Sequence, residues 1–470
     1  MNCSYRFLAA ILAGWLFFAV NGRAADPVVQ TCFTADPAPL VHNGVVYLYT
    51  GHDEDDARGF RMLDWKCYTS TDMVNWTDHG AVATLKTFPW AVQTNDAWAP
   101  QIVERDGKFY FYAPVSVPGR PKNVIGVAVA DNPLGPFKDV LGRPLIDKAN
   151  GYIDPTVFID DDGQAYLYWG NPELWFVKLN KDMISYSGEI VKDASFAKVK
   201  GEPDAYHYQE GPWAYNRNGH YYMAFASTCC PEGIGYAMSD KPTGPWQFKG
   251  YIMKPDARSS GNHPGIIDYK GGSYVFGFDY RLNKALTNER RERRSVCVEK
   301  FDYNPDGTIP ELPWWDDTGN VAQIGTLNPY VRTEAETICW SEGIKSEPSS
   351  DGGMNIYPTK DGAYIEVKGV DFGAEGADTF SASVALDTTE ETAKTNAIEL
   401  HLDGMDGPLI GTLRVTHVGG QPKTETAAVT DATNKRDLFL VFKGDLTGKL
   451  FKVDYWTFSK KTVMPQKPLR

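Results

Sequence analysis

The sequence has no excess of positive charge: 60 acidic side chains outnumber 47 basic ones, and the formal net charge is −13. A protein that holds nucleic acid or an anionic membrane surface through its overall charge needs the opposite balance. The composition therefore predicts no nucleic acid partner. It is compatible with an uncharged ligand such as a carbohydrate.

An apolar run long enough for a comfortable membrane span is also missing. The N-terminal run FLAAILAGWLFFAV has 14 residues, whereas a spanning helix needs roughly 20. Arg6 precedes the run and the small residues of 22–25 follow it, which is typical of a secretory signal peptide over residues 1–25. No Leu-x-x-Cys lipobox follows. We expect a secreted or periplasmic protein without membrane insertion.

Cysteine is scarce, and no cysteine stands at zinc-like spacing with histidine. Six of the seven cysteines remain once Cys3 leaves with the signal peptide, and an oxidising compartment permits disulfides whose pairing the sequence leaves open. For the adjacent Cys229 and Cys230 we expect two buried thiols rather than a vicinal disulfide. A long amphipathic helix is missing too, so the pattern predicts an all-β protein.

Aromatic residues, by contrast, make up 13% of the chain, and many of them recur at a fixed phase. Five turn glycines, each followed by an aromatic-rich run, are spaced 53 to 63 residues apart: Gly44, Gly107, Gly163, Gly219 and Gly272. A repeat of this length with alternating apolar residues predicts a β-propeller with one blade per repeat. We place a five-bladed propeller at residues 26–325.

One position of the repeat carries residues suited to chemistry. Eight or nine residues before each turn glycine stand Asp36, Trp98, Asp154, Glu210 and His263. The innermost strands of all blades line one central channel, so these five side chains are expected to converge although they are far apart in sequence.

The repeat stops after a segment rich in Pro, Gly and acidic residues near residues 304–320. Residues 326–470 then contain short runs with alternating apolar residues and no helical period, which predicts a linker and an antiparallel β-sandwich of jelly-roll type.

Hydrolysis of a glycosidic bond needs one carboxyl group that protonates the leaving oxygen and a second that activates water or attacks directly. Asp36, Asp154 and Glu210 offer three carboxyl groups, each close to a proline. An Asp-Pro pair favours an extended backbone, which would hold the carboxylate rigidly. Three acids at equivalent positions of the repeat are stronger evidence for an enzyme than any one of them alone.

The repeat region resembles glycoside hydrolase family 43, the five-bladed propeller glycosidases. The motifs that carry the resemblance are Ala35-Asp36-Pro37, Asp96-Ala97-Trp98, Ile153-Asp154-Pro155, Glu210-Gly211-Pro212 and His263-Pro264-Gly265. The resemblance implies an inverting mechanism that needs no cofactor. In it, Asp36 is the general base, Glu210 is the general acid, and Asp154 orients Glu210 and raises its pKa.

The resemblance also implies roles for four further residues. His263 would lie beside a Ca²⁺ or Na⁺ in the channel, held through water, or would simply be hydrogen-bonded there. Arg281 would contact sugar hydroxyls. Trp98 and Trp213 would stack on the sugar or pack under the channel rim.

The charged runs 52–56 and 290–294 are expected to be solvated loops.

The C-terminal part resembles carbohydrate-binding module family 6. Glu334-Ala335-Glu336 at its start and Asp454-Tyr455-Trp456 near its end carry this resemblance. It implies a structural Ca²⁺ held by Glu334, Glu336 and Asp454. The tryptophan that the family usually places after a Gly-Gly pair is missing after Gly419, so weak sugar binding is expected.

Together these likenesses predict a secreted enzyme that acts on plant cell-wall pentosan, most similar to arabinofuranosidases that remove side chains from arabinoxylan. β-Xylosidase is the second expectation and endo-arabinanase the third. The alternative from another functional class is a propeller that binds carbohydrate without hydrolysing it. Such a protein does not need three acids at equivalent positions of the repeat.

Overall fold

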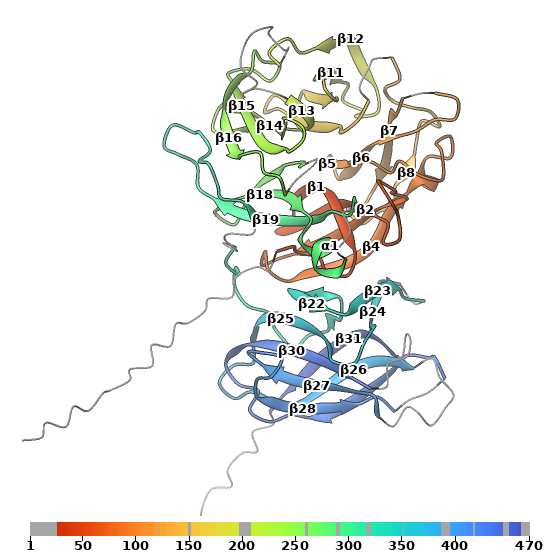
Figure 1. Ribbon diagram of the computed structural model, residues 1–470, viewed down its shortest axis with the longest axis vertical. Helices are drawn as coiled ribbons and strands as arrows, with labels where there is room; N and C mark the ends of the chain where they lie inside the picture. Colours follow the sequence, from red (N-terminus) through yellow and green to blue (C-terminus); the bar gives the residue numbers. More distant parts are fainter. Residues whose placement is uncertain are drawn as a thin grey trace, which may run out of the picture.

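The computed structural model describes residues 26–120, 122–148, 152–196, 208–258, 262–287, 292–315, 321–350, 352–386, 395–416, 419–444 and 451–461. Strands dominate these residues, and they form two bodies that lie one against the other (Figure 1). The predicted signal peptide, residues 1–25, lies outside the described residues. The all-β prediction is confirmed.

The N-terminal body consists of five antiparallel sheets, each built from consecutive strands. The first holds β1 (Phe33–His42), β2 (Val45–Asp53), β3 (Asp64–Ser70) and β4 (Trp76–Thr84). The second holds β5 (Gln101–Arg105), β6 (Lys108–Val115), β7 (Val124–Ala130) and β8 (Lys138–Asp139). The third holds β9 (Thr156–Ile159), β10 (Ala165–Trp169), β11 (Trp175–Leu179) and β12 (Tyr186–Lys192). The fourth holds β13 (Tyr208–Arg217), β14 (His220–Ser227), β15 (Gly233–Ser239) and β16 (Gln247–Met253), and the fifth holds β17 (Gly265–Tyr269), β18 (Gly272–Asp279) and β19 (Ser295–Phe301).

The sheets are the five blades of a propeller. The aromatic runs that follow the turn glycines form the second strand of each blade, and their rings pack between neighbouring sheets. The first strands form the inner ring, where β1 contacts β5 and β17, and β9 contacts β5 and β13. Each first strand therefore starts at the same end of the propeller, and the turns between second and third strands return to that end.

The fifth blade is completed by the N-terminal segment. The amide of Val28 donates to the carbonyl of Val296 (2.9 Å), and the amide of Thr34 donates to the carbonyl of Arg294 (3.0 Å). These bonds cover the outer edge of β19 with residues that lead into blade one. The ring is closed by its own first residues, which protects a sheet edge that would otherwise remain open.

The C-terminal body is a sandwich of two sheets around one apolar core. One sheet has the order β23 (Ile344–Pro348), β24 (Met354–Pro358), β31 (Phe451–Lys460), β26 (Ala377–Leu386) and β29 (Lys423–Ala428), with β20 (Thr333–Glu334) paired to β31. The other has the order β22 (Trp340–Glu342), β25 (Ala363–Asp371), β30 (Lys435–Lys443), β27 (Ala397–Leu402) and β28 (Leu409–Arg414). The predicted β-sandwich is confirmed.

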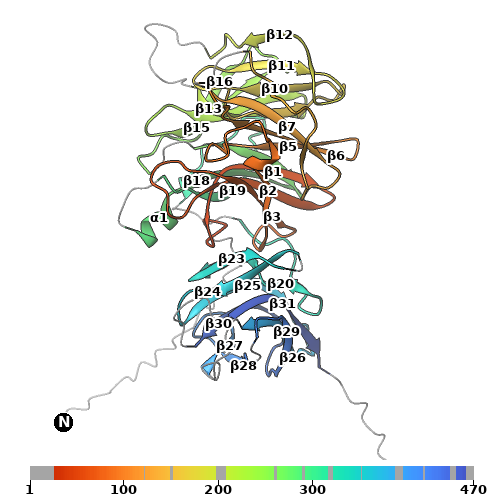
Figure 2. The same cartoon turned by 90° about the vertical axis from the view of Figure 1, so that its right-hand side faces the viewer.

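The two bodies share a sheet. Strand β21 (Thr337–Ile338) pairs with β4 and becomes the fifth strand of blade one, with Thr337 opposite Thr77. Figure 2, turned by 90°, shows β23 and β24 beside the same blade. Before the sandwich begins, Trp314 and Trp315 are buried in the propeller core. The described part of the connection is therefore docked on the propeller.

Helix is nearly absent from the described part of the chain. It has one short α-helix, α1 (Arg281–Leu286), and the 3₁₀ turn η1 (Leu85–Thr87). None of the described helices is long and apolar enough to cross a membrane.

The prediction for the adjacent cysteines is wrong. Cys229 and Cys230 are joined in a disulfide, and both residues are exposed in the turn between β14 and β15. The four other cysteines of the described chain, Cys32, Cys67, Cys297 and Cys339, are buried thiols.

Candidate active site

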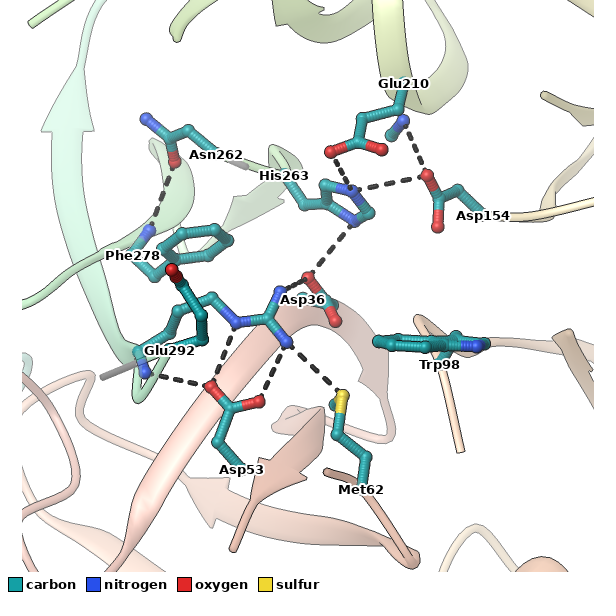
Figure 3. A network of polar contacts seen from close by, with 12 residues as sticks. Asp36, Asp53, Met62, Trp98, Asp154, Glu210, Asn262, His263, Phe278 and Glu292 are labelled. Atoms are coloured by element: carbon teal, nitrogen blue, oxygen red, sulfur yellow. Dashed lines mark hydrogen bonds and ion pairs between the residues drawn. The ribbon is translucent and has the colours of Figure 1, made fainter. Parts of the chain in front are cut away.

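Four of the five side chains at the repeat position meet at one end of the channel (Figure 3). His263 lies at the centre: its Nδ1 is 3.4 Å from Asp36 Oδ1, and its Nε2 is 3.3 Å from Asp154 Oδ2 and 3.8 Å from Glu210 Oε1. Asp36, Asp154 and His263 are buried, and Glu210 is half-buried. The expected convergence of the blades at this point is thus observed.

The backbone holds two of these acids in an unusual conformation. Asp36 has a φ of 52° and Asp154 a φ of 58°, in the left-handed region that residues other than glycine rarely adopt. The prediction that the Asp-Pro pairs are extended is wrong. Backbone strain of this kind costs on the order of 1–3 kcal/mol and clusters at functional sites, which agrees with a role for these two carboxylates.

Gly211 lets the histidine approach the fourth blade. Its φ is 60°, and a Cβ added there would lie 2.7 Å from the imidazole carbon Cδ2 of His263. The amide of Gly211 donates to Asp154 (3.1 Å). A side chain at this position would both strain the backbone and push the imidazole away from Glu210.

The arginine of the site is Arg294. Its guanidinium donates to Asp36 (2.7 Å) and forms two bonds with Asp53 (2.9 Å each). Arg293 and Arg294 are both 5% exposed, so the prediction of a solvated run at 290–294 is wrong for these two residues. Asp53, in the acidic run 52–56, is also buried. A buried arginine of this kind must be paired, and the two acids pair it.

Arg281, the arginine that the sequence assigned to sugar binding, lies on α1. Its guanidinium donates to the backbone carbonyl of Asp26 (2.6 Å) and pairs with Asp279 (3.3 Å). These contacts tie α1 to the segment that closes the propeller. Arg281 therefore lies at the seam between the ends of the ring, and its contact with sugar stays a prediction.

The two tryptophans have different surroundings. Trp98 is half-buried, lies beside the acids in Figure 3, and has the partly exposed ring of Phe60 at its edge (centroids 6.1 Å apart). Trp213 is buried, and its indole donates to the carbonyl of Ile266 (3.0 Å). This position agrees with packing of Trp213 under the channel rim, and stacking on a sugar stays a prediction.

Asn171 is a member of the site that the sequence analysis did not select. Its side-chain amide donates to Glu210 Oε2. Asn171 and Arg294 both follow the second strand of a blade, and such segments lie at the same end as the acids. The signal was therefore available in the repeat, because every connection between second and third strands reaches this end.

The acids differ in their affinity for protons. Burial raises the pKa of Asp36, although Arg294 and His263 oppose this shift. Burial raises the pKa of Asp154 to about 6, again against the pull of His263. Burial opposes a charged imidazole, but Asp154 and Asp36 outweigh it, and the pKa of His263 lies well above its usual range.

Glu210 is shifted in the opposite direction. Burial would raise its pKa, but hydrogen bonding and attraction from His263 and the bond from Asn171 outweigh it, so the pKa is lowered. The prediction that Asp154 keeps Glu210 protonated is wrong for the substrate-free site. There, the surrounding carboxylates raise the pKa of His263, and burial raises the pKa of Asp154 to about 6.

Asp36 and Glu210 face each other across the imidazole. One contacts Nδ1 and the other Nε2, at 3.4 and 3.8 Å. An imidazole ring flanked by two such contacts separates the carboxyl groups by a distance compatible with the roughly 6.5–9.5 Å of inverting glycosidases, where a water stands between base and sugar.

Both nitrogens of His263 thus face carboxylate oxygens. The ligand atoms of Asp154, Glu210 and His263 lie within 4.8 Å of one another. A channel cation held through water at His263 would have to compete with these contacts, and this ion stays a prediction.

The predicted calcium ligands of the sandwich fit in part. Arg332 pairs with Glu334 (2.8 Å) and Asp454 (3.3 Å), so these two carboxylates already have a positive partner. Glu336 is 4% exposed, and its Oε2 has no hydrogen-bond partner among the described residues. Burial, together with repulsion from Glu334, Asp78 and Asp454, raises the pKa of Glu336 to about 9. An orphaned buried carboxylate among other acids suits a cation.

Comparison with known families agrees with this geometry. Residues 25–309 match the model of glycosyl hydrolases family 43, and residues 334–460 match that of carbohydrate binding module family 6. The first match spans more than half of the chain. The protein belongs to glycosyl hydrolase family 43. It is a glycoside hydrolase with a C-terminal family 6 module, and both resemblances drawn from the sequence are confirmed.

Several family 43 relatives extend over nearly the whole chain. An arabinoxylan arabinofuranohydrolase of Paenibacillus polymyxa is 32% identical over 98% of this chain and 80% of its own length. Another, of Bacillus subtilis, is 33% identical over 93% of both. The crystal structure of a family 43 arabinoxylan arabinofuranohydrolase from Bacillus subtilis in complex with cellotetraose has a TM-score of 0.78 at 31% identity, covering 93% of this chain and 97% of that one.

Proposed function

We propose that this family 43 enzyme removes α-L-arabinofuranosyl side chains from arabinoxylan with inversion at the anomeric carbon. The observation that carries the proposal is the single cluster of Asp36, Asp154, Glu210 and His263 at the channel end. The choice of substrate is supported by the relatives named arabinoxylan arabinofuranohydrolase, which cover both domains. Relatives named xylosidase/arabinosidase cover about 60% of this chain, so β-xylosidase is kept as an outcome of the test.

Asp36 acts as the general base. It accepts a proton from the water that attacks the anomeric carbon, while Arg294 and His263 oppose the rise in its pKa that burial causes. Asp53 holds the other side of the Arg294 guanidinium, so that the charge at Asp36 is fixed in position. Two carboxyl groups and water suffice for this chemistry, and no cofactor takes part in it.

Glu210 acts as the general acid. Because its carboxylate is ionised in the free site, the proton must reach it from its neighbours when substrate is bound. His263 Nε2 stands between Asp154 and Glu210, at 3.3 and 3.8 Å. The imidazolium supplies the proton to Glu210, which passes it to the leaving oxygen, and Asp154 sustains the positive charge of the histidine.

The family 6 module holds a structural calcium ion at Glu336, with Glu334 and Asp454 nearby. The unpartnered oxygen of Glu336 supports this part of the proposal. Calcium is bound by oxygen ligands, and the ion would neutralise a carboxyl group that otherwise stays protonated in its buried position.

The enzyme works on polysaccharide outside the cytoplasm after removal of residues 1–25. This part of the proposal is supported by the apolar run after Arg6 and by an acidic composition that suits a neutral polymer.

Hydrolysis of matched substrates tests the function. Aryl α-L-arabinofuranoside and aryl β-D-xyloside are compared, with wheat arabinoxylan as the polymer. We expect arabinose from the first and the third, and proton NMR of the earliest product should show the inverted anomer. Preference for the xyloside would make the protein a β-xylosidase. Release of no sugar from any of the three would overturn the proposed function, and a retained anomer would overturn the mechanism.

A further inference from the structure

The turn between β14 and β15 exposes a disulfide bond, which is uncharged. Cys229 and Cys230 are joined in a disulfide and both are exposed, whereas the other cysteines of the described chain are buried. Sulfur joined in this way offers no thiolate to a metal, carries no charge, and is polarisable enough to pack against apolar groups. The turn therefore presents a small apolar patch to solvent.

The strand register places this patch beside the acid site. Tyr208 pairs with Ser227, and Glu210 pairs with Ala226, at the end of blade four where the inner strand begins. Cys229 follows Ala226 by three residues, at most about 10 Å along the chain at roughly 3.3 Å per residue. The disulfide thus lies at the rim of the site that holds Glu210.

The turn is held in place on both sides. Thr228 donates through its hydroxyl to the carbonyl of Pro231 (2.9 Å) within the turn. Glu232 is 2% exposed, and its Oε2 accepts from the amide of Asn262 (2.7 Å), the residue that precedes His263. A surface fixed this firmly loses little conformational entropy when a ligand binds it.

We propose that the Cys229–Cys230 disulfide is a substrate-binding surface, which packs against a backbone sugar of the polysaccharide next to the residue that is cleaved. This inference rests on the proposed function. Sugar rings present apolar C–H faces between their hydroxyl groups, and a rigid, uncharged patch at the rim matches such a face. The cleaved sugar itself lies with the acids, so the disulfide affects the part of the substrate on the leaving side.

The test removes the disulfide and compares two substrates. In the variant C229A/C230A, we expect KM for an arabinoxylo-oligosaccharide to rise about five-fold with little change in kcat. On aryl α-L-arabinofuranoside, which has no backbone sugar, the loss in kcat/KM should be less than two-fold. Lys241→Ala, an exposed change in the turn at the opposite end of the same blade, should alter neither. Equal losses on both substrates would mean that the turn only supports Glu232 and His263, which overturns the proposal, as does no loss on the oligosaccharide.

A binding measurement separates this proposal from the proposed function. Calorimetry with the same oligosaccharide uses Glu210→Gln protein with the disulfide intact, removed by mutation, or reduced with a phosphine, with equal melting temperatures as the check on folding. Affinity about five-fold weaker without the disulfide supports the proposal. Unchanged affinity overturns it, and so does failure of the intact protein to bind. Binding without hydrolysis by the unmodified enzyme overturns the proposed function alone.

Discussion

Asp36 and Glu210 are both carboxylates at one phase of the repeat, but their neighbours differ. Both contact the imidazole of His263, but Asp36 also accepts from the guanidinium of Arg294, whereas Glu210 accepts from the amide of Asn171. The same side chain can therefore act as base in one blade and as acid in another. Environment, more than residue type, assigns the role.

Substitution of the two acids should separate their roles. Glu210→Gln should lower kcat/KM on oligosaccharides about 10²–10⁴-fold and much less on activated aryl glycosides, because only a poor leaving group needs protonation. Asp36→Asn should abolish activity on both, since water must be activated in every case. Initial rates on the two substrate types measure this. Asp106→Asn, an exposed acid at the far end of blade two, serves as the control. Equal losses for both variants on both substrates would contradict the assignment.

The pH profile should report the shared protons. Asp154 has a pKa raised to about 6, and its carboxylate raises the pKa of His263. We expect Asp154→Asn to remove an inflection near pH 6 from kcat/KM and to move the alkaline limb to lower pH, because His263 then loses its proton more easily. Profiles on an oligosaccharide substrate measure both effects. An alkaline limb that stays in place or moves to higher pH would show that Asp154 does not sustain the proton on His263.

At the scale of the element, each inner strand has two tasks. It contributes hydrogen bonds to its blade, and a residue near its start or just before it carries a side chain of the site. Asp36 and Asp154 leave the regular β conformation to do the second task. The turn glycines and the strand alternation could be predicted because they are local. The left-handed backbone of the two acids could not, since an Asp-Pro pair favours extended structure and only the surrounding blades hold it otherwise.

Short strands also join the two domains, and Glu336 lies at this joint. Its backbone carbonyl accepts from the amide of Asp78 in blade one (3.3 Å), and β21 begins at the next residue. A cation at Glu336 would therefore stabilise the contact between the domains as well as the module.

Calcium should raise the melting temperature. Saturation of one site with the ion at about 100 times its dissociation constant adds about 2.7 kcal/mol, which corresponds to a rise of roughly 5 °C or more. Glu336→Gln should abolish the response, whereas Glu342→Gln, an exposed glutamate paired with Lys360, should keep it. Melting curves in chelator and in calcium chloride decide this. An undiminished response in Glu336→Gln would place the ion elsewhere.

At the scale of the whole molecule, the module is a structural partner of the propeller. Asn75 exchanges two hydrogen bonds with the backbone of Lys368 (2.9 and 3.0 Å), and Ser346 donates to Asp78 (2.7 Å). Where the family usually places its sugar-binding tryptophan, β29 exposes Lys423 and Thr424. The ring of Tyr455 nearby is covered by the guanidinium of Arg332 at 4.1 Å.

Truncation after residue 325 should therefore reduce stability more than polymer affinity. Loss of β21 uncovers the edge of β4 and the polar contacts of blade one, and we expect the melting temperature to fall by roughly 5 °C or more. Affinity electrophoresis on arabinoxylan should retard the full chain and the truncated chain to a similar extent. Strong retardation of the full chain alone would show that the module binds the polymer, through rings such as Trp340 and Tyr364 that are only half-buried.

Much of the fold and of the acid site could be predicted from the sequence. The blade period, the phase of Asp36, Asp154, Glu210 and His263, and the change to a sandwich all follow from strand alternation and turn residues, which act over a few neighbours. Because the propeller is a closed ring, residues at equivalent positions of different blades then meet at the channel. This is why the fold and the four polar side chains of the cluster were predicted correctly.

The tertiary structure alone decided the rest. Arg294 reaches Asp36 from 258 residues away, Asn171 reaches Glu210 from 39, and β21 joins a sheet that ended more than 250 residues earlier. The pKa shifts of the acids and of His263 depend on burial and on charges from residues far away in the sequence, which no local sequence pattern encodes. The sequence identified Asp36, Asp154, Glu210 and His263 as groups of the channel, and only the tertiary structure showed their partners and the distances that shift their pKa values.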